Sequence, residues 1–209
     1  MPPVDLSPVE IRVLGALLEK QRTTPDAYPL TLNSLRLACN QSTNRDPVVE
    51  YDEESIREAL DRLHRRGFTR LTSTHGSRAP KFRHLLDDAL PAGRDELALL
   101  CVLMLRGPQT PGELKQRSER LHDFADLAAV HATLERLIER GLAAGLGRRP
   151  GQKEDRYAQL LGEGEDEVAA SGSAPPAPTG ESTAGPGDVA ERLERLEARV
   201  AALERAVGG

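Results

Sequence analysis

The sequence predicts a mainly α-helical protein with small β-hairpins, an α+β fold built from two similar units. The first observation behind this prediction is periodicity, because apolar residues recur at helical spacing through most of the first 161 residues. The second is composition: aromatic residues make up 3% of the chain and tryptophan is absent. A core built from Leu, Val, Ile and Ala favours small helical domains over a large β-sandwich. The third observation is an internal repeat.

The repeat relates two segments that lie 74 residues apart. SIREALDRLHRRGF at residues 55–68 matches AVHATLERLIERGL at residues 129–142. Both segments end in Arg-Gly followed by an apolar residue, and the glycine is expected to stop the helix. KFRHLL at residues 81–86 parallels RYAQLL at residues 156–161 at nearly the same offset. The two units therefore share one plan.

Each unit is expected to begin with a helix. In the first unit, SPVE at residues 7–10 is a capping box with proline at the first helical position. In the second, residues 94–106 contain DELALLCVLML, which is apolar enough to be the buried helix of its unit. A second helix follows at residues 30–40 and after the capping box TPGE at residues 110–113. The third helix is the repeated segment, and its inward-facing residues are predicted to be Ile56, Leu60, Leu63, Val130, Leu134, Leu137 and Ile138.

A β-hairpin is predicted after each third helix. In residues 68–86, FTRLTSTHGSRAPKFRHLL, β-forming residues lie on both sides of HGSR, which has a turn composition. Residues 142–161 repeat this pattern with the turn at residues 148–152. Three helices followed by a two-stranded wing form the plan of a winged helix-turn-helix domain. We therefore predict two such domains in tandem, at residues 1–90 and 91–161.

The remainder of the chain divides into a linker and a helix. Residues 162–187 are rich in Gly, Pro, Ser, Ala and acid, which predicts a flexible linker. Residues 188–209 return to helical periodicity, and six apolar residues spaced alternately four and three apart predict a coiled coil. The flanking charges favour a parallel homodimer; the alternative is a lone surface helix or one docked on its own domain. The predicted dimerisation residues are Val189, Leu193, Leu196, Val200, Leu203 and Val207.

Cysteine usage and hydropathy predict a cytoplasmic protein. Cys39 and Cys101 lie far apart within apolar helical patterns, which argues against a disulfide framework and a CxxC metal site. No run approaches the roughly 18 apolar residues of a membrane span, and MPPVDLSPVE lacks the pattern of a leader. The net charge of −5 divides into +1 over residues 1–160 and −6 over residues 161–209. The acidity therefore belongs to the tail and does not describe what the folded part binds.

Two long stretches resemble the YceH-like family of bacterial proteins. They are EKQRTTPDAYPLTLNSLRLACNQSTNRDPV at residues 19–48 and QTPGELKQRSERLHDFADLAAVHATLERL at residues 109–137. The resemblance covers about residues 4–161. It implies tandem winged-helix domains in a non-enzymatic, intracellular bacterial protein whose family has no settled biochemical role.

A polar run between the second and third helices of the first unit is a candidate nucleic-acid contact. Residues 38–48, ACNQSTNRDPV, carry side chains of the types that reach phosphates and base edges. The corresponding stretch of the second unit, RSERLHDFAD, lacks this composition. The alternative is that these side chains satisfy backbone groups in an irregular loop. The candidate contact residues are Asn40, Gln41, Thr43, Asn44 and Arg45.

The two wings are the second candidate contact. The third helix of the first unit balances four acids with four arginines between residues 53 and 66, which is a handicap for DNA binding. The wings are more basic, and residues 65–83 contain no acid. They could clamp a nucleic-acid backbone or enter a minor groove; the alternative is ordinary solvated surface. The candidate residues are Arg65, Arg66, Arg70, Arg78, Lys81, Arg83, Arg148, Arg149 and Lys153.

The sequence contains little that points to catalysis. The five histidines lie on different predicted elements without metal-binding spacing, and neither a glycine-rich phosphate loop nor a GxSxG motif occurs. We expect no enzymatic activity, no cofactor and no metal. Two hypotheses remain open: a nucleic-acid-binding protein with a role in transcription regulation, whose partner is duplex DNA, and a scaffold that uses winged-helix faces to bind a protein partner.

Overall fold

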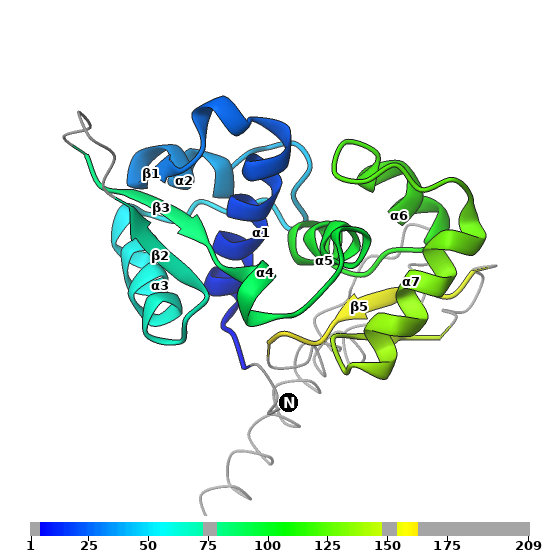
Figure 1. Ribbon diagram of the computed structural model, residues 1–209. Coiled ribbons are helices and arrows are strands. Elements are labelled where there is room, and N and C mark those ends of the chain that lie inside the picture. The colour runs from blue at the N-terminus through cyan, green and yellow to red at the C-terminus, as the bar shows by residue number, and fades with distance from the viewer. Residues whose placement is uncertain (1–4, 73–78, 148–153, 163–209) are drawn as a thin grey trace, which may run out of the picture. The chain divides into compact units, whose positions relative to one another are not determined.

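The computed structural model describes residues 5–72, 79–147 and 154–162 of the chain (Figure 1). Within these ranges the protein is of the α+β class, with seven α-helices and two small antiparallel sheets. The predicted linker at residues 162–187, apart from its first residue, and the predicted tail helix with its six dimerisation residues lie outside the described ranges. The described residues all belong to one compact unit.

The first half contains three helices and a three-stranded sheet. Ser7 caps the first helix through the predicted capping box, accepting from the Glu10 amide while the Glu10 carboxylate accepts from the Ser7 amide. The sheet has the order β1-β3-β2 with both pairings antiparallel. The elements are α1 (Pro8–Thr23), a 3-10 turn (Pro25–Ala27), β1 (Leu30–Thr31), α2 (Leu32–Cys39), α3 (Glu53–Arg65), β2 (Thr69–Thr72) and β3 (Lys81–His84).

The second half repeats this order after a short connecting helix. β4 and β5 pair antiparallel, and an isolated bridge between Gln109 and Tyr157 takes the place that β1 has in the first half. The two copies of the sequence repeat, α3 and α7, are both capped by an aspartate and both followed by a glycine with positive φ. The elements are α4 (Leu86–Ala89), α5 (Arg94–Arg106), α6 (Pro111–Ser118), α7 (Leu127–Glu139), β4 (Ala143–Gly145) and β5 (Tyr157–Gln159).

One predicted core position is wrong. Ile138 is 41% exposed, whereas the other six predicted inward-facing residues of α3 and α7 are buried. Ile138 lies in the last turn of α7, where Leu142 just beyond the helix occupies the core instead. Apolar periodicity alone does not show which residue at a helix end is displaced by the next element.

The two halves share one hydrophobic core, whose centre is the contact between α1 and α5. Figure 1 shows these two helices in the middle of the body, with the remaining helices and strands of each half outside them. At the crossing, a Cβ atom added to Gly15 would lie 2.9 Å from Leu105 Cδ2 and 3.1 Å from Met104 Cβ. The thiol of Cys101 donates a hydrogen bond of 3.5 Å to the Gly15 carbonyl. Close approach of the two helices therefore depends on the missing side chain of Gly15.

A second connection joins the start of the first half to the end of the second. The Leu6 amide donates to the Leu161 carbonyl at 2.9 Å, and Leu6 forms a parallel bridge with Gly162. Leu6 and Leu161 are both buried in the shared core. The chain segments before α1 and after β5 are thus held side by side.

Candidate functional site

Arg45, in the polar loop after α2, is a buried structural residue. Its side chain is fully shielded from solvent and its guanidinium forms a two-pronged ion pair with Glu19, at 3.1 and 2.6 Å. Its remaining N–H groups donate to the carbonyls of Ala38 and Asn44 and to the Gln41 side chain. All five donors of the guanidinium are thereby occupied. Arg45 is therefore not placed to contact a phosphate.

Three of the other four predicted contact residues of this loop are also held by internal bonds. The Asn40 side chain donates to the Tyr51 carbonyl at 2.8 Å and accepts from the Tyr51 amide at 3.0 Å. It thus satisfies both backbone polar groups of Tyr51, as a paired strand would. Asn44 adopts a left-handed conformation with φ of 60°, and its side chain accepts from Arg106. Gln41 accepts from Lys20 and Arg45, whereas Thr43 is exposed. These contacts match the structural interpretation of the loop.

The wing of the first half brings basic side chains together. The register of β2 and β3 places Arg70 directly opposite Arg83, and Thr72 opposite Lys81. Thr69 and His84, the next pair along the hairpin, are both 2% exposed and face the core. Because side chains alternate between the faces of a strand, Arg70, Lys81 and Arg83 lie together on the outer face. We call these three residues the wing cations.

The wing cations lack acidic neighbours on the hairpin. No Asp or Glu occurs between residues 66 and 86, and like charges directly opposite each other destabilise an antiparallel pair by a few tenths of a kcal/mol or more. Arg70 and Arg83 are both exposed. A polyanion lying across this face would attract both guanidinium groups and so offset the repulsion between them. The pair is therefore a candidate for contact with a phosphate backbone.

The flanking predicted residues divide between described and undescribed parts of the chain. Arg65 is exposed at the end of α3. Arg66 is also exposed; its guanidinium lies 5.8 Å from the Phe68 ring centroid and donates to the Asp5 carbonyl. The remaining four predicted wing residues lie outside the described ranges: Arg78, Arg148, Arg149 and Lys153.

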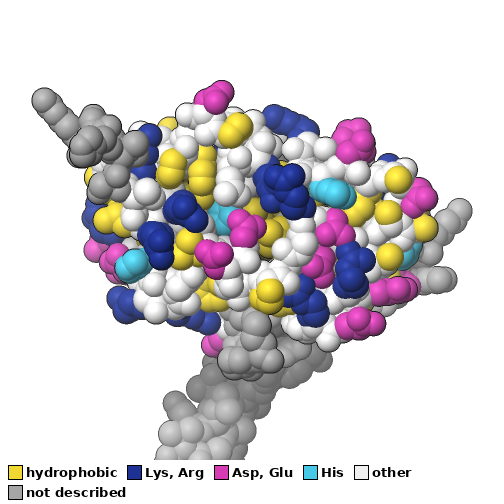
Figure 2. All heavy atoms as spheres, in the orientation of Figure 1, with side chains coloured by type: hydrophobic (Ala, Val, Ile, Leu, Met, Phe, Trp, Pro, Cys, Tyr) yellow, Lys and Arg dark blue, Asp and Glu magenta, His cyan; other side chains and the backbone are white. Residues whose placement is uncertain are grey.

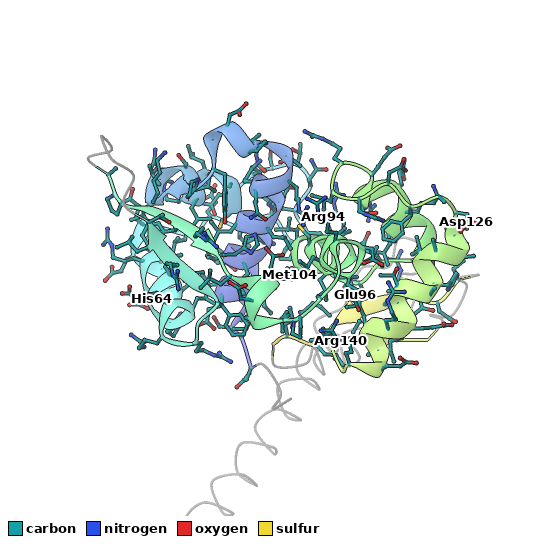
Figure 3. All side chains as sticks on the ribbon, viewed as in Figure 1. His64, Arg94, Glu96, Met104, Asp126 and Arg140 are labelled. Carbon is teal, nitrogen blue, oxygen red and sulfur yellow. The ribbon has the colours of Figure 1, made fainter. Side chains whose placement is uncertain are left out.

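The second half is less basic where it is described. Its strands β4 and β5 carry no charged residue. Arg140 at the end of α7 forms an ion pair with Glu96 of α5 at 3.0 Å (Figure 3), and Arg136 pairs with Asp95. Arg156 pairs with Glu113 at 3.1 Å. These arginines are neutralised within the protein, so the wing of the first half is the better candidate for anion binding.

The surface charge elsewhere is mixed. Figure 2 shows Lys and Arg side chains interspersed with Asp and Glu over the visible face, without a large area of one sign. On α3, Arg62 forms ion pairs with Glu10 at 3.1 Å and with Glu58 at 3.5 Å. The exposed acids of α3 outnumber the arginines that remain, so this helix would be repelled by DNA unless the wing supplied the attraction. The exposed acids are Glu53, Glu54, Glu58 and Asp61.

His84 anchors the inner side of the same wing. Its Nε2 lies 2.7 Å from the Gln21 side-chain oxygen, its Nδ1 accepts from the Leu86 amide, and its own amide donates to the Tyr28 hydroxyl. Because an amide oxygen only accepts, Nε2 carries the proton of a neutral ring. Burial lowers the pKa of His84 to about 4. Both ring nitrogens are satisfied only in this neutral form.

The burial of His84 predicts that the protein loses stability in mild acid. The pKa of an unfolded histidine is near 6.5, so below that pH the unfolded state binds a proton that the folded state excludes. Stability is full above about pH 6.5 and falls by roughly 3 kcal/mol as the pH approaches 4. Urea unfolding at several pH values should show this slope in the native protein and a smaller one in His84→Gln. An identical slope in the variant would show that other groups cause the loss.

Sequence reasoning missed a small cavity between the two halves. Arg12 of α1 and Tyr51 line it together with side chains of α5 and β5. The signal was present, because Arg12 is the one charged residue in the run IRVLGALL. In the described part of the chain, no three His, Cys, Asp or Glu side chains are grouped as a metal site would require. None of the helices described there has the length and apolar character needed to cross a membrane.

Comparison with known proteins identifies the family. Residues 6–152 match the family described as protein of unknown function, DUF480. A UPF0502 protein of Pseudomonas syringae pv. tomato is 46% identical over 201 residues, which cover 96% of this chain and 90% of the relative. A UPF0502 protein of Pseudomonas fluorescens is 49% identical, with 95% and 90% covered, and one of Geotalea daltonii is 51% identical, with 83% and 79% covered. The chain therefore belongs to the DUF480/UPF0502 family of uncharacterised bacterial proteins, which fits its resemblance to the YceH-like family.

Proposed function

We propose that this chain is a tandem winged-helix protein that binds duplex DNA through the wing of its first half. The order of three helices and a hairpin in each half, and the sheet order β1-β3-β2, support the winged-helix assignment. The observation that carries the binding proposal is the placement of Arg70 opposite Arg83, with Lys81 on the same face. Regulation of transcription is the role that such binding would serve.

The wing would act on the DNA backbone rather than on the bases. The three wing cations have the chemistry to bind phosphates, and phosphate contacts position a protein on the duplex without reading its sequence. The acidic outer face of α3 opposes deep insertion of this helix into a groove. The proposal therefore predicts salt-sensitive binding of modest sequence preference, centred on the wing cations.

Charge reversal at Arg70 separates binding from folding. Arg70→Glu replaces the like-charged pair with a Glu opposite Arg83, so the folded state should be more stable by a few tenths of a kcal/mol. Affinity for a short random-sequence duplex should nevertheless fall about tenfold, and the slope of log K against log salt should lose about one to two units. Fluorescence anisotropy over a salt series measures both, and urea unfolding measures stability.

Arg120 provides the matched control, because it is an exposed arginine on the loop after α6 in the second half. Arg120→Glu changes net charge as much as Arg70→Glu but should leave most of the affinity intact. Equal losses in the two variants would mean that net charge, and not the wing, governs binding. Native protein that fails to bind duplex DNA even at low salt would reject the proposal.

A protein-interaction scaffold is the second candidate, and the exposed side of α7 favours it. Leu127 is 46% exposed and Ile138 is 41% exposed, and their separation of three helical turns puts them on one face. Two exposed apolar side chains on the helix that a winged-helix protein would offer to DNA suit a protein partner better than a phosphate backbone. Absence of DNA binding together with loss of a partner in Leu127→Glu would favour this function.

The proposal includes three further expectations that rest on the sequence. The protein is non-enzymatic and cytoplasmic, and its tail forms a parallel homodimer through the heptad seam. A dimer would place two wings on one duplex, and two-point attachment strengthens binding without new contacts. The solution mass of the full chain, compared with a chain ending at Glu165, checks the dimer. A monomeric full chain would remove this part of the proposal.

A further inference from the structure

A cavity of about 140 Å³ lies between the two halves, beside the crossing of α1 and α5. Its walls are mainly apolar and include Ile11 from α1 and Leu103 and Met104 from α5. Figure 3 labels Met104 on α5 at the centre of the molecule, where the halves meet. Small-molecule sites commonly occupy such junctions, with apolar walls and a few fixed polar groups. A cavity of about 150 Å³ is large enough to hold a benzene ring.

The charged group of the cavity is Arg12. Arg12 is only 4% exposed. Its Nη1 donates to the Cys39 carbonyl at 3.1 Å, and its Nη2 donates to the Pro47 carbonyl at 2.7 Å. Its Nε is buried without a hydrogen-bond partner. No carboxylate of the described residues forms an ion pair with it, in contrast to Arg45 with its Glu19. Burial lowers the pKa of Arg12, and the charge of Asp46 offsets this only in part, so the guanidinium is incompletely balanced and also lacks one hydrogen bond, which is costly unless a ligand supplies both.

Two further polar residues of the lining restrict the ligand. Burial raises the pKa of the Tyr51 phenol, so this group is a neutral hydrogen-bond donor at physiological pH. Asp46 also lines the cavity and is exposed. Because Asp46 already offsets part of the Arg12 charge, the cavity cannot balance a dianion such as phosphate, and a ligand with a single negative charge fits it better. The lining therefore suits a monoanion with an apolar body.

We propose that this cavity binds a small monoanionic carboxylate with an aromatic or branched apolar body, its carboxylate against Arg12 and its body against Leu103 and Met104. The size of the cavity limits the body to about one six-membered ring. The ligand contacts residues of both halves at once, so it would hold α1 against α5. This inference does not depend on the proposed DNA binding, because none of the wing cations lines the cavity.

Benzoate is a suitable probe, and the chain contains a natural reporter for it. Only two methionines occur in the sequence, Met1 and Met104. In protein labelled with ¹³C at the methionine methyl groups, benzoate should shift the Met104 resonance saturably through its ring current, while Met1 serves as the internal reference. The Kd should be on the order of 1 mM, as expected for a ligand of this size. Benzyl alcohol, which has the same ring but no charge, should bind at least about tenfold more weakly.

Two variants complete the test. Ile11→Trp fills the cavity without altering Arg12 and should abolish the saturable shift while the protein stays folded. Arg12→Lys keeps the charge but loses the planar fork, and should weaken benzoate about tenfold with little effect on benzyl alcohol. An unshifted Met104 resonance at about ten times the expected Kd, or equal affinity for benzoate and benzyl alcohol, would overturn the proposal. An unchanged shift in folded Ile11→Trp would also overturn it, because the ligand would then lie elsewhere.

Discussion

Replacing Gly15 with leucine is expected to abolish the native fold. Even a Cβ at this position would meet Leu105 and Met104 at 2.9 to 3.1 Å, closer than side chains normally approach. A leucine adds three more carbon atoms at the centre of the shared core, and both neighbours are buried. Overpacking of this kind costs at least 1–3 kcal/mol and separation of α1 from α5 costs more, against a total stability of about 5–15 kcal/mol. Far-UV circular dichroism and urea unfolding would show the loss.

Gly15→Ala is the graded version of this change, and Gly112→Ala is its matched control. Alanine gains about 1 kcal/mol of helix propensity over glycine at either site. At Gly112 of α6 the new Cβ would find nothing closer than 4.0 Å, so that variant should be more stable than the native protein. At Gly15 the steric cost should outweigh the propensity, giving a net loss of about 1 kcal/mol or more. A stabilised Gly15→Ala protein would contradict the tight crossing.

Removal of the Arg45 guanidinium is expected to produce the second large effect. In Arg45→Met, Glu19 keeps a side chain that is only 16% exposed and retains only the weaker contact with Lys20 at 3.5 Å, while the Ala38 carbonyl loses two donors. Breaking one side of such a buried pair costs about 3–5 kcal/mol. Burial by itself raises the pKa of Glu19, but the hydrogen bonds and charge of Arg45 outweigh it and hold the pKa below its ordinary value. The variant should therefore be least impaired in acid, where Glu19 is protonated.

A double-mutant cycle measures how much of this loss belongs to the pair. Arg45→Met combined with Glu19→Gln should be more stable than the sum of the single changes predicts, because the second change removes the stranded charge. Arg120→Met is the control, and as an exposed substitution it should change stability by no more than about 0.5 kcal/mol. A loss below about 1 kcal/mol in Arg45→Met would show that the loop does not depend on this residue.

Much of the fold could be predicted because its signals are local. The capping boxes at Ser7 and Thr110 mark the true starts of α1 and α6, and the repeat correctly paired α3 with α7. The two-residue strand β1 could not be predicted, since it is recognisable only through its pairing with β3. The contact at Gly15 was equally hidden, because a glycine within a helix pattern does not reveal which neighbour it admits.

The candidate site was harder to predict, since the same residue types serve opposite purposes. Asn40 and Arg45 have the chemistry of phosphate-binding residues, but their partners are backbone groups and Glu19, which only the three-dimensional structure brings near. The acid-free composition of the first wing was visible in the sequence, whereas the register that sets Arg70 against Arg83 was not. A shift of one residue in that register would have moved the arginines to opposite faces.

The pairing of Leu6 with Leu161 has a consequence for the folding kinetics of the molecule. This contact closes a loop of about 155 residues. Bringing the two ends of such a loop together costs chain entropy, and this cost is lowest once the intervening chain is already ordered. Contacts of such large sequence separation slow folding relative to a helical bundle of the same size. The two halves are repeats in sequence, yet their shared core and this contact lead us to expect that they fold together rather than independently. Within the described residues the chain begins and ends at one place, where Leu6 pairs with Leu161 and Gly162.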